Sequence, residues 1–220
     1  MTSRVHHPVF ARMYRRIADA AEGKGAGEHR DELLAGLSGR VIEVGAGTGL
    51  NFAHYSAGVT EVVAVEPEPY LRAAAAEAAA DAPVPVSIVD GTADELPAEP
   101  GEFDAGVASL VLCSVPNQRR ALGELFRVIR PGGQLRFYEH VRSAKPGFAR
   151  LQRAVDLVWP LVGGGCHTSR ETDRAITDAG FTIDEIRRFE FRPAICAAPV
   201  SPHVLGVARH PVTPKWLEPT

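Results

Sequence analysis

The sequence predicts an α/β fold, a doubly wound sheet of seven strands that is mostly parallel and ends in an antiparallel C-terminal hairpin. Three observations predict it. Short β-branched segments alternate with helical segments between residues 40 and 140, a glycine-rich loop follows the first of those strands, and two strand segments close the chain at 181–191 and 203–209. A length of 220 residues with 45% hydrophobic side chains fits one domain over residues 1–220.

The N-terminal residues 1–35 are expected to form a helical cap. Apolar side chains at helical spacing, with Tyr14 among them, predict an amphipathic helix over 9–21, and the glycines within 22–27 break it. The cap is therefore expected to be a helix followed by a turn.

The alternation of strands and helices begins at residue 40. The strand 40–44 runs into the loop Gly45–Gly49, and residues 50–55 are expected to continue as a helix. Further segments of the same kind follow: a strand at 61–65, a helix at 70–82, strands at 84–89 and 103–113, a helix at 117–130 and a strand at 134–140. The run 103–113 is apolar on both faces, which suits the middle of a covered parallel sheet.

The pattern changes after residue 140, where we expect a helical lid insertion over 141–180. Three glycines at 163–165 stand where a sixth strand was due. Thr168 and Glu171 have the spacing of a capping box and predict a helix over 169–179. Residues 193–202 are expected to be a loop, and 210–220 a loose tail.

Composition narrows the possible partners. The chain has 24 basic and 27 acidic side chains and a net charge of −3, which gives no basic surface for nucleic acid. Its three cysteines are unevenly spaced, so we expect neither a disulfide framework nor a metal site, and a reducing, cytoplasmic location. No signal peptide or membrane span is expected. A small-molecule substrate remains, with the oligomeric state open and a monomer possible.

The glycine loop predicts a nucleoside ligand. Glycines let the backbone approach a ligand closely, and Glu66 stands 21 residues after Gly45, where an acid for a ribose hydroxyl is expected. Leu50 departs from the sixth position of a dinucleotide motif, and Glu43 would repel phosphates and attract a sulfonium group. Both departures favour S-adenosylmethionine over NAD.

At this point the chain resembles the class I S-adenosylmethionine-dependent methyltransferases, which have a Rossmann-like fold. The motifs that carry the resemblance are 43–49, Glu66, 91–97 and the turn 130–133. The resemblance, with the loop analysis above, implies S-adenosylmethionine as cofactor, S-adenosylhomocysteine as product, and a set of cofactor-binding residues: Tyr14, Glu43, Gly45, Ala46, Gly47, Thr48, Gly49, Asn51, Glu66, Pro67, Gly91, Thr92, Ala93, Ser109 and Leu110.

A narrower resemblance bears on the methyl acceptor. Segments 110–115, 139–141, 165–172 and 202–206 are similar to the methyltransferase-like alkyl thiol S-methyltransferases, which implies S-methylation of a small thiol. His140, at the end of a strand, is the candidate base. The candidate substrate residues are Cys113, Trp159, Cys166, His167, Arg170 and His203.

Other functions stay open on the sequence alone. The acceptor could instead be a phenolic or quinone-like metabolite that is methylated on oxygen or carbon. The chain could also be a non-catalytic module that binds S-adenosylmethionine, or a nicotinamide oxidoreductase.

Overall fold

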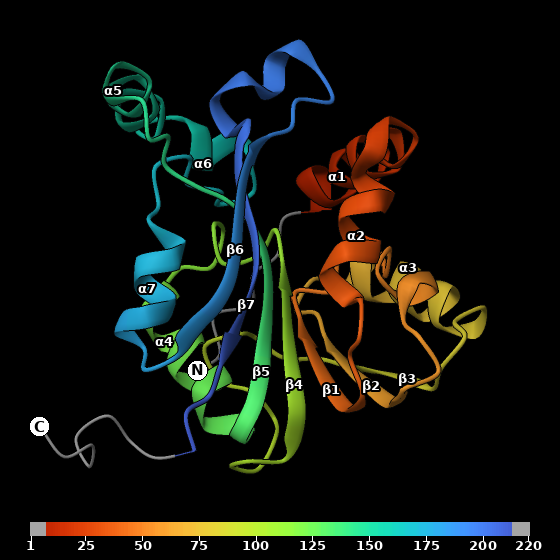
Figure 1. The fold of residues 1–220 in the computed structure, drawn as a ribbon. Helices are drawn as coiled ribbons and strands as arrows, with labels where there is room; N and C mark the ends of the chain where they lie inside the picture. Colours follow the sequence, from red (N-terminus) through yellow and green to blue (C-terminus); the bar gives the residue numbers. More distant parts are fainter. Residues whose placement is uncertain (1–7, 213–220) are drawn as a thin grey trace, which may run out of the picture.

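The computed structural model describes residues 8–212, with the side chains of 8–10, 195 and 196 left out, so the predicted tail lies mostly outside the described residues. Its centre is a seven-stranded sheet in the order β3-β2-β1-β4-β5-β7-β6 (Figure 1). The strands are β1 (Gly39–Val44), β2 (Val59–Val65), β3 (Val86–Val89), β4 (Phe103–Ser109), β5 (Ile129–His140), β6 (Thr182–Glu190) and β7 (Pro202–Arg209). The first five strands pair in parallel and β7 runs antiparallel to β5 and β6, which confirms the predicted fold class.

Helices cover both faces of this sheet. The helical elements are α1 (Pro8–Ala21), α2 (Gly27–Leu34), α3 (Pro69–Ala80), α4 (Gln118–Val128), α5 (Pro146–Val155), α6 (Trp159–Val162) and α7 (Thr172–Asp178), with a kinked turn η1 (Glu22–Ala26) and 3-10 turns η2 (Phe52–His54) and η3 (Ile195–Val200). Because strand side chains alternate between faces, Val41 packs with α2 and η2, whereas Ile42 packs with α4 and α7. Two hydrophobic cores result, one on each side of the sheet.

The cap and the predicted lid differ in how they meet the sheet. The expected break after α1 is a kink, with Lys24 and Gly25 outside helical φ and ψ, after which the chain resumes as α2. Within 141–180, α5 and α6 stand above the edge of the sheet, whereas α7 packs on its face through the fully buried Ile176 (Figure 1). The predicted capping box is wrong, because Thr168 Oγ1 donates to the carbonyl of Gln152 at 3.1 Å.

The helix predicted at 50–55 is replaced by the single 3-10 turn η2. β1 is six residues long, so an α-helix running back along it would span about 20 Å and need about 13 residues. Only ten residues, Gly49 to Gly58, separate the glycine loop from β2. The more extended 3-10 and turn conformations cover the distance with fewer residues.

The strand predicted at 103–113 ends early, at Ser109. Leu110 has a φ of +57°, a left-handed conformation in which a strand cannot continue. The backbone then turns through residues 111–115 before α4 begins. This turn carries several of the predicted site residues to the edge of the sheet.

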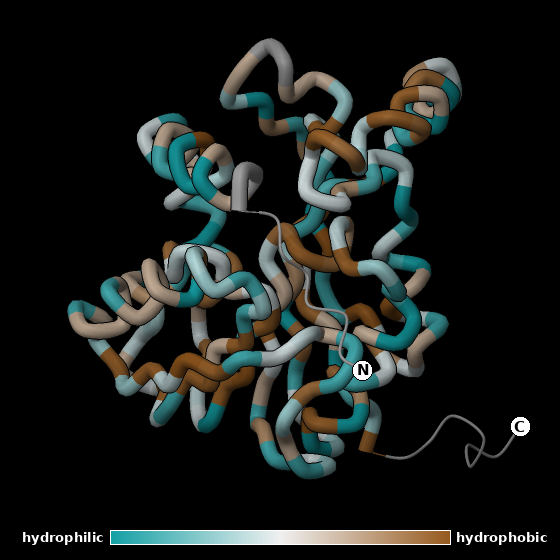
Figure 2. The backbone as a smooth tube through the Cα atoms, turned by 180° about the vertical axis from the view of Figure 1, so that it is seen from behind, coloured by the Kyte–Doolittle hydropathy of each residue, from teal (hydrophilic) through white to brown (hydrophobic). Residues whose placement is uncertain are grey.

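No helix in the described part of the chain is both long and apolar enough to cross a membrane. Hydrophobic segments run through the sheet and also through α5 and α6, at the upper right of Figure 2. There Leu157 and Leu161 are 81% and 83% exposed.

Candidate functional site

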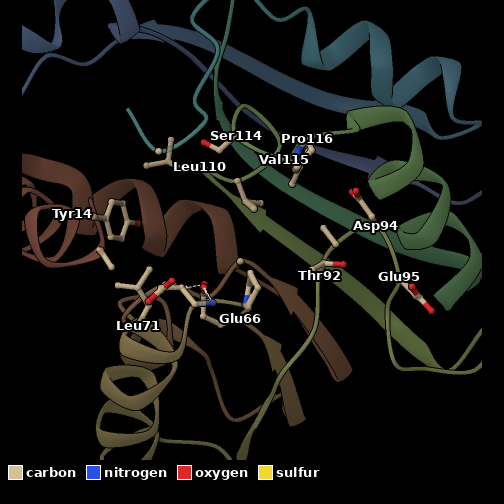
Figure 3. Close-up of a pocket in the computed structure, with 18 of the residues that line it drawn as sticks. Tyr14, Glu66, Leu71, Thr92, Asp94, Glu95, Leu110, Ser114, Val115 and Pro116 are labelled. Atoms are coloured by element: carbon tan, nitrogen blue, oxygen red, sulfur yellow. Dashed lines mark hydrogen bonds between the residues drawn. The ribbon is translucent and has the colours of Figure 1, made fainter. Parts of the chain in front are cut away.

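A cleft of about 450 Å³ opens where β1, β2 and β4 end. This volume is in the range of small-molecule sites, which occur at this edge of open α/β sheets. Tyr14, Glu66 and Leu71 lie along one side of the cleft, Leu110, Ser114 and Val115 along the other, and Thr92 and Asp94 beyond them (Figure 3). Apolar side chains therefore face a group of carboxylates across the cleft.

Glu66, the first residue after β2, lines this cleft and is 5% exposed. Its Oε2 accepts the backbone N–H of Gly47 at 2.8 Å, and its Oε1 accepts that of Glu68 at 2.9 Å. Burial raises the pKa of Glu66 to about 7, although the two backbone hydrogen bonds act in the opposite direction. The carboxylate is thus fixed in place, with lone pairs left for a ligand.

The glycine loop gives the cleft its floor. Gly45 and Gly47 have φ values of +64° and +59°, which favour glycine. A side chain at Gly47 would meet the ring of Tyr14 at 3.3 Å, so α1 places this aromatic ring directly against the loop. Burial raises the pKa of Tyr14, which keeps its hydroxyl protonated.

Glu43 lies beneath the loop and connects it to η2. Its two oxygens accept hydrogen bonds from Asn51 Nδ2 at 2.8 Å and from the Tyr55 hydroxyl at 2.7 Å. Arg30 Nη1 in turn donates to Asn51 Oδ1 at 2.6 Å. Burial raises the pKa of Glu43 to about 7, and these partners oppose the rise. In this arrangement Glu43 supports the loop from below.

Three polar atoms around the cleft are buried without a hydrogen-bond partner among the described residues: Thr48 Oγ1, Asp94 Oδ1 and Ser109 Oγ. Buried polar atoms are nearly always satisfied, so such atoms beside a cleft indicate a ligand that completes them. Asp94 also lines the cleft, and burial raises its pKa.

Glu139 organises the opposite side of the site. This side chain on β5 is fully buried, and it accepts the backbone N–H groups of Val111, Leu112 and Cys113 at 2.8–3.0 Å. Burial raises the pKa of Glu139, while the three donors favour its ionised form. The turn after β4 is held to β5 through this one carboxylate.

The same turn is also held from the 141–180 segment. Arg170 donates to the carbonyl oxygens of Leu112 and Val115 at 2.5 and 2.8 Å. The backbone N–H of His167 donates to the carbonyl oxygen of Cys113 at 2.8 Å. Burial and the neighbouring Arg170 lower the pKa of His167. In the structure, both predicted substrate residues contact the backbone of the turn.

Cys113, Cys166 and His140 lie together behind this turn. His140 Nδ1 is 3.6 Å from Cys113 Sγ and 3.5 Å from Cys166 Sγ. Hydrogen bonding with Cys166 and burial raise the pKa of the Cys113 thiol. Trp159, the first residue of α6, packs against both cysteines.

His203 lies next to His140, with ring centroids 4.6 Å apart. It is 3% exposed, and its Nδ1 is 2.8 Å from the carbonyl oxygen of Ser201. Burial, followed by the charge of His140, lowers the pKa of His203 to about 3, so it is neutral at physiological pH. His140 is thus the partly exposed member of this histidine pair.

Eight of the predicted cofactor residues line the cleft, whereas the predicted base His140 and the six predicted substrate residues do not. Those that line it are Tyr14, Gly45, Gly47, Glu66, Pro67, Thr92, Ala93 and Leu110. The other predicted cofactor residues, which back it from the same elements, are Glu43, Ala46, Thr48, Gly49, Asn51, Gly91 and Ser109.

Sequence reasoning missed several residues of the site. Four of them line the cleft: Glu68, Leu71, Asp94 and Arg120. A fifth, Glu139, holds the turn after β4 in place. A signal existed for two of them. Asp94 lies within the motif 91–97 that the sequence analysis identified. Glu139 is an acidic residue near the end of the strand predicted at 134–140.

Comparisons with known proteins agree with this geometry. The family described as "Methyltransferase domain" matches residues 42–137. Human thiol S-methyltransferase TMT1B is 35% identical over 181 residues, which cover 80% of this chain and 73% of the relative. The ubiquinone/menaquinone biosynthesis C-methyltransferase UbiE of Methylobacterium nodulans is 31% identical, over 68% of this chain and 59% of the relative.

A solved structure shows the same fold. A putative methyltransferase from Bacillus halodurans superposes with a TM-score of 0.69 and 17% identity, over 84% of this chain and 98% of that chain.

Proposed function

Because this chain belongs to the family of S-adenosylmethionine-dependent methyltransferases that includes human thiol S-methyltransferase TMT1B, we propose that it transfers a methyl group to the thiol sulfur of a small molecule. The single observation that carries the choice of acceptor is the match to TMT1B over 80% of the chain. The cleft supports the cofactor through its carboxylates and the acceptor through its apolar wall.

The residues around the cleft fit the cofactor. Glu66, Glu68, Asp94 and Glu95 surround it, against one cation, Arg120, among its lining residues. Such a balance suits a cationic nucleoside and disfavours a pyrophosphate. When bound, S-adenosylmethionine supplies a methyl group on a positively charged sulfur.

We assign individual contacts to residues that line the cleft. Glu66 keeps lone pairs for the ribose hydroxyls, and the partnerless Asp94 Oδ1 is placed to accept the exocyclic amine of adenine. Tyr14 covers the glycine loop and excludes water from it. These contacts orient the cofactor, and orientation supplies much of the rate of a group transfer.

The acceptor side of the cleft is apolar. Leu110, Val111, Val115 and Pro116 line it. A thiol with a pKa of about 8.5 is already a few per cent ionised at pH 7, so it needs little help from a base. In a water-poor site, a thiolate and a sulfonium lose their charges as the methyl group moves, which such surroundings favour.

The direct test uses labelled cofactor and a panel of small alkyl thiols, phenols and quinols, with S-adenosylhomocysteine and the methylated product measured by mass spectrometry. We expect methyl thioethers from the thiols. The Glu66→Ala variant should lose activity, whereas Glu77→Ala, which removes an exposed carboxylate on α3, should not.

The match to UbiE favours a second candidate, C-methylation of a quinone-like metabolite. Turnover of quinols or phenols without turnover of thiols would assign this reaction and contradict S-methylation. Binding of S-adenosylhomocysteine without turnover of any acceptor would instead indicate a binding module.

We also propose a reducing, cytoplasmic setting for the protein. Cys113 and Cys166 form no disulfide, although their sulfur atoms lie within 4.8 Å of each other. Such neighbouring thiols persist where disulfides are kept reduced. Alkylation of intact cells followed by peptide mapping should find both thiols unoxidised.

A further inference from the structure

Three metal-ligating side chains converge beside the cleft from separate parts of the chain. Cys113 comes from the turn after β4, His140 from the end of β5, and Cys166 from the segment after α6. Cys113 Sγ, Cys166 Sγ and His140 Nδ1 all lie within 4.8 Å of one another. The two cysteines are buried, and His140 is partly exposed.

The two distances from His140 Nδ1 to the cysteine sulfurs match those around a tetrahedral zinc ion. Bonds of about 2.3 Å to sulfur and about 2.05 Å to nitrogen, at the tetrahedral angle, place the two ligand atoms about 3.55 Å apart. The observed separations from His140 Nδ1 are 3.6 Å to Cys113 Sγ and 3.5 Å to Cys166 Sγ. His140 Nδ1 is therefore already at a zinc-ligand separation from both sulfur atoms.

A neutral ring nitrogen with a lone pair accepts one hydrogen, so His140 Nδ1 can serve only one of the two equidistant thiols at a time. The thiol that does not donate to His140 can hydrogen-bond the other thiol or, for Cys113, Ser114 Oγ at 3.5 Å. A cation would take a lone pair from all three atoms at once.

The ligands are also held in place by their surroundings. Glu139 binds the N–H of Cys113 and of the two residues before it, while Arg170 binds the carbonyl oxygens of Leu112 and Val115. The hydrogen bond from His167 N–H to the carbonyl of Cys113 joins the two cysteine segments. Such fixed outer contacts are what metal sites require of their surroundings.

The cluster adjoins the acceptor side of the cleft. Ser114, next to Cys113, and Gly164, two residues before Cys166, both line the cleft, and Ser114 is seen at its wall in Figure 3. The three ligands do not line the cleft themselves, but the two cysteines lie one and two residues along the chain from residues of its wall.

We propose that Cys113, His140 and Cys166 bind Zn²⁺, and that the fourth position of this ion takes the sulfur of the acceptor thiol. Two cysteines and one histidine with one open position form a known kind of catalytic zinc site. The role of the fourth position rests on the proposed function, whereas the binding of the ion does not. The proposal replaces both the expectation of no metal site and the assignment of His140 as the base.

The chemistry balances without a further reactant. The acceptor thiol gives its proton to water when its sulfur binds the ion. The sulfur then forms a bond to the methyl carbon while the bond from that carbon to the donor sulfonium breaks, with its electron pair left on the donor sulfur. A neutral methyl thioether results, which is a weaker ligand than a thiolate and leaves the ion.

Metal binding is tested first, on the whole reduced protein and without an activity assay. We expect one Zn²⁺ per chain after dialysis, and Co²⁺ in its place to give the visible bands of tetrahedral thiolate coordination. His140→Gln should weaken affinity for Zn²⁺ by more than about tenfold, the effect of losing even an outer partner of a ligand. His54→Gln is the matched control, because His54 pairs with Asp31 at 2.7 Å and faces no cysteine.

Two results would overturn the site. One is wild-type protein that takes up no Zn²⁺ or Co²⁺ under reducing conditions. The other is equal uptake by the wild type and His140→Gln, which would identify an adventitious ion only. The wild-type titration decides the matter even if a variant fails to fold.

The role of the open position is tested next. Adding an alkyl thiol to the Co²⁺ protein should shift its visible spectrum, and removing the metal should reduce thiol methylation while binding of S-adenosylhomocysteine is unchanged. Equal thiol methylation with and without metal would overturn the role of the ion and leave the proposed function intact. A bound metal and a spectral shift without thiol methylation would contradict the proposed function and leave the site intact.

Discussion

Glu66 accepts a hydrogen bond from the backbone N–H of Gly47, with 2.8 Å between Oε2 and N. The carboxylate that ends β2 is thus joined to the loop that follows β1. Its other oxygen accepts the N–H of Glu68, so the side chain cannot rotate without losing a buried contact. The position of this carboxyl group is therefore set before any ligand arrives.

Replacing Glu66 should therefore weaken the cofactor site. We expect Glu66→Ala to reduce the affinity for S-adenosylhomocysteine by at least about 1 kcal/mol, close to fivefold, which is the scale of a lost hydrogen bond to a charged group. Isothermal titration calorimetry measures the change, with Glu77→Ala as the control on the exposed side of α3. An unchanged affinity would count against this residue as the ribose ligand.

The buried Glu43 should make stability depend on pH. Its pKa is raised from 4.5 to about 7, so between these values the folded protein holds a proton that the unfolded chain has released. The free energy of unfolding should then fall as pH rises through this window, by an amount on the order of 3 kcal/mol.

The variant Glu43→Gln isolates this effect. Glutamine can keep both hydrogen bonds, by accepting from Asn51 and donating to the Tyr55 oxygen, and it does not titrate. Urea unfolding at pH 5 and pH 8 should show the wild type losing stability relative to the variant. The neutral His203, with a pKa lowered to about 3, gives the opposite slope but is present in both proteins and cancels. Parallel pH curves would refute the prediction.

Glu139 should be needed for the turn after β4. In Glu139→Gln an amide nitrogen replaces the oxygen that accepts the N–H of Cys113. Both groups are then donors, so this hydrogen bond is lost. We expect a loss of about 1–3 kcal/mol in the free energy of unfolding, the scale of an unsatisfied buried group. Chemical denaturation measures it, and Glu185→Gln on the exposed face of β6 is the matched control. Equal stability of the two variants would mean that the three hydrogen bonds contribute little.

Gly45 should tolerate no side chain. An added Cβ would lie 2.3 Å from Val111 Cγ2, and the φ of +64° is left-handed, which alone costs about 1–2 kcal/mol for alanine. Thermal unfolding of Gly45→Ala should show a loss greater than this backbone strain. Adding Val111→Ala removes Cγ2 but leaves Val111 Cβ at 2.9 Å, so it should restore only part of the loss due to the clash and leave the part due to φ. Additive destabilisation in the double variant would mean that the two residues do not compete for space.

The sequence signals for the proposed cofactor residues are local. The glycines at 45–49 and the acid 21 residues later follow from the geometry of two adjacent parallel strands, and the structure places Glu66 and Gly47 in contact. The fold class is confirmed for the same reason, since strand and helix periodicity are properties of short segments.

The acceptor half depends on contacts between distant segments. Cys113, His140 and Cys166 show no metal-binding spacing, because the order of β4, β5 and the later loops brings them together. Likewise, the early end of β4 depends on Glu139, which lies 30 residues after Ser109. The helix predicted at 50–55 fails because the length of β1, and not local propensity, decides the connection.

Donor and acceptor are served by different parts of one sheet. In the proposed function, the ends of β1 and β2 and the loop after β3 bind the nucleoside, whereas the turn after β4 and Gly164 of segment 141–180 form the wall on the acceptor side. Chimeras that exchange only residues 141–180 should therefore methylate different acceptors, while their affinity for the methyl donor stays that of the host protein. Evolution can diversify such a scaffold by the same exchange.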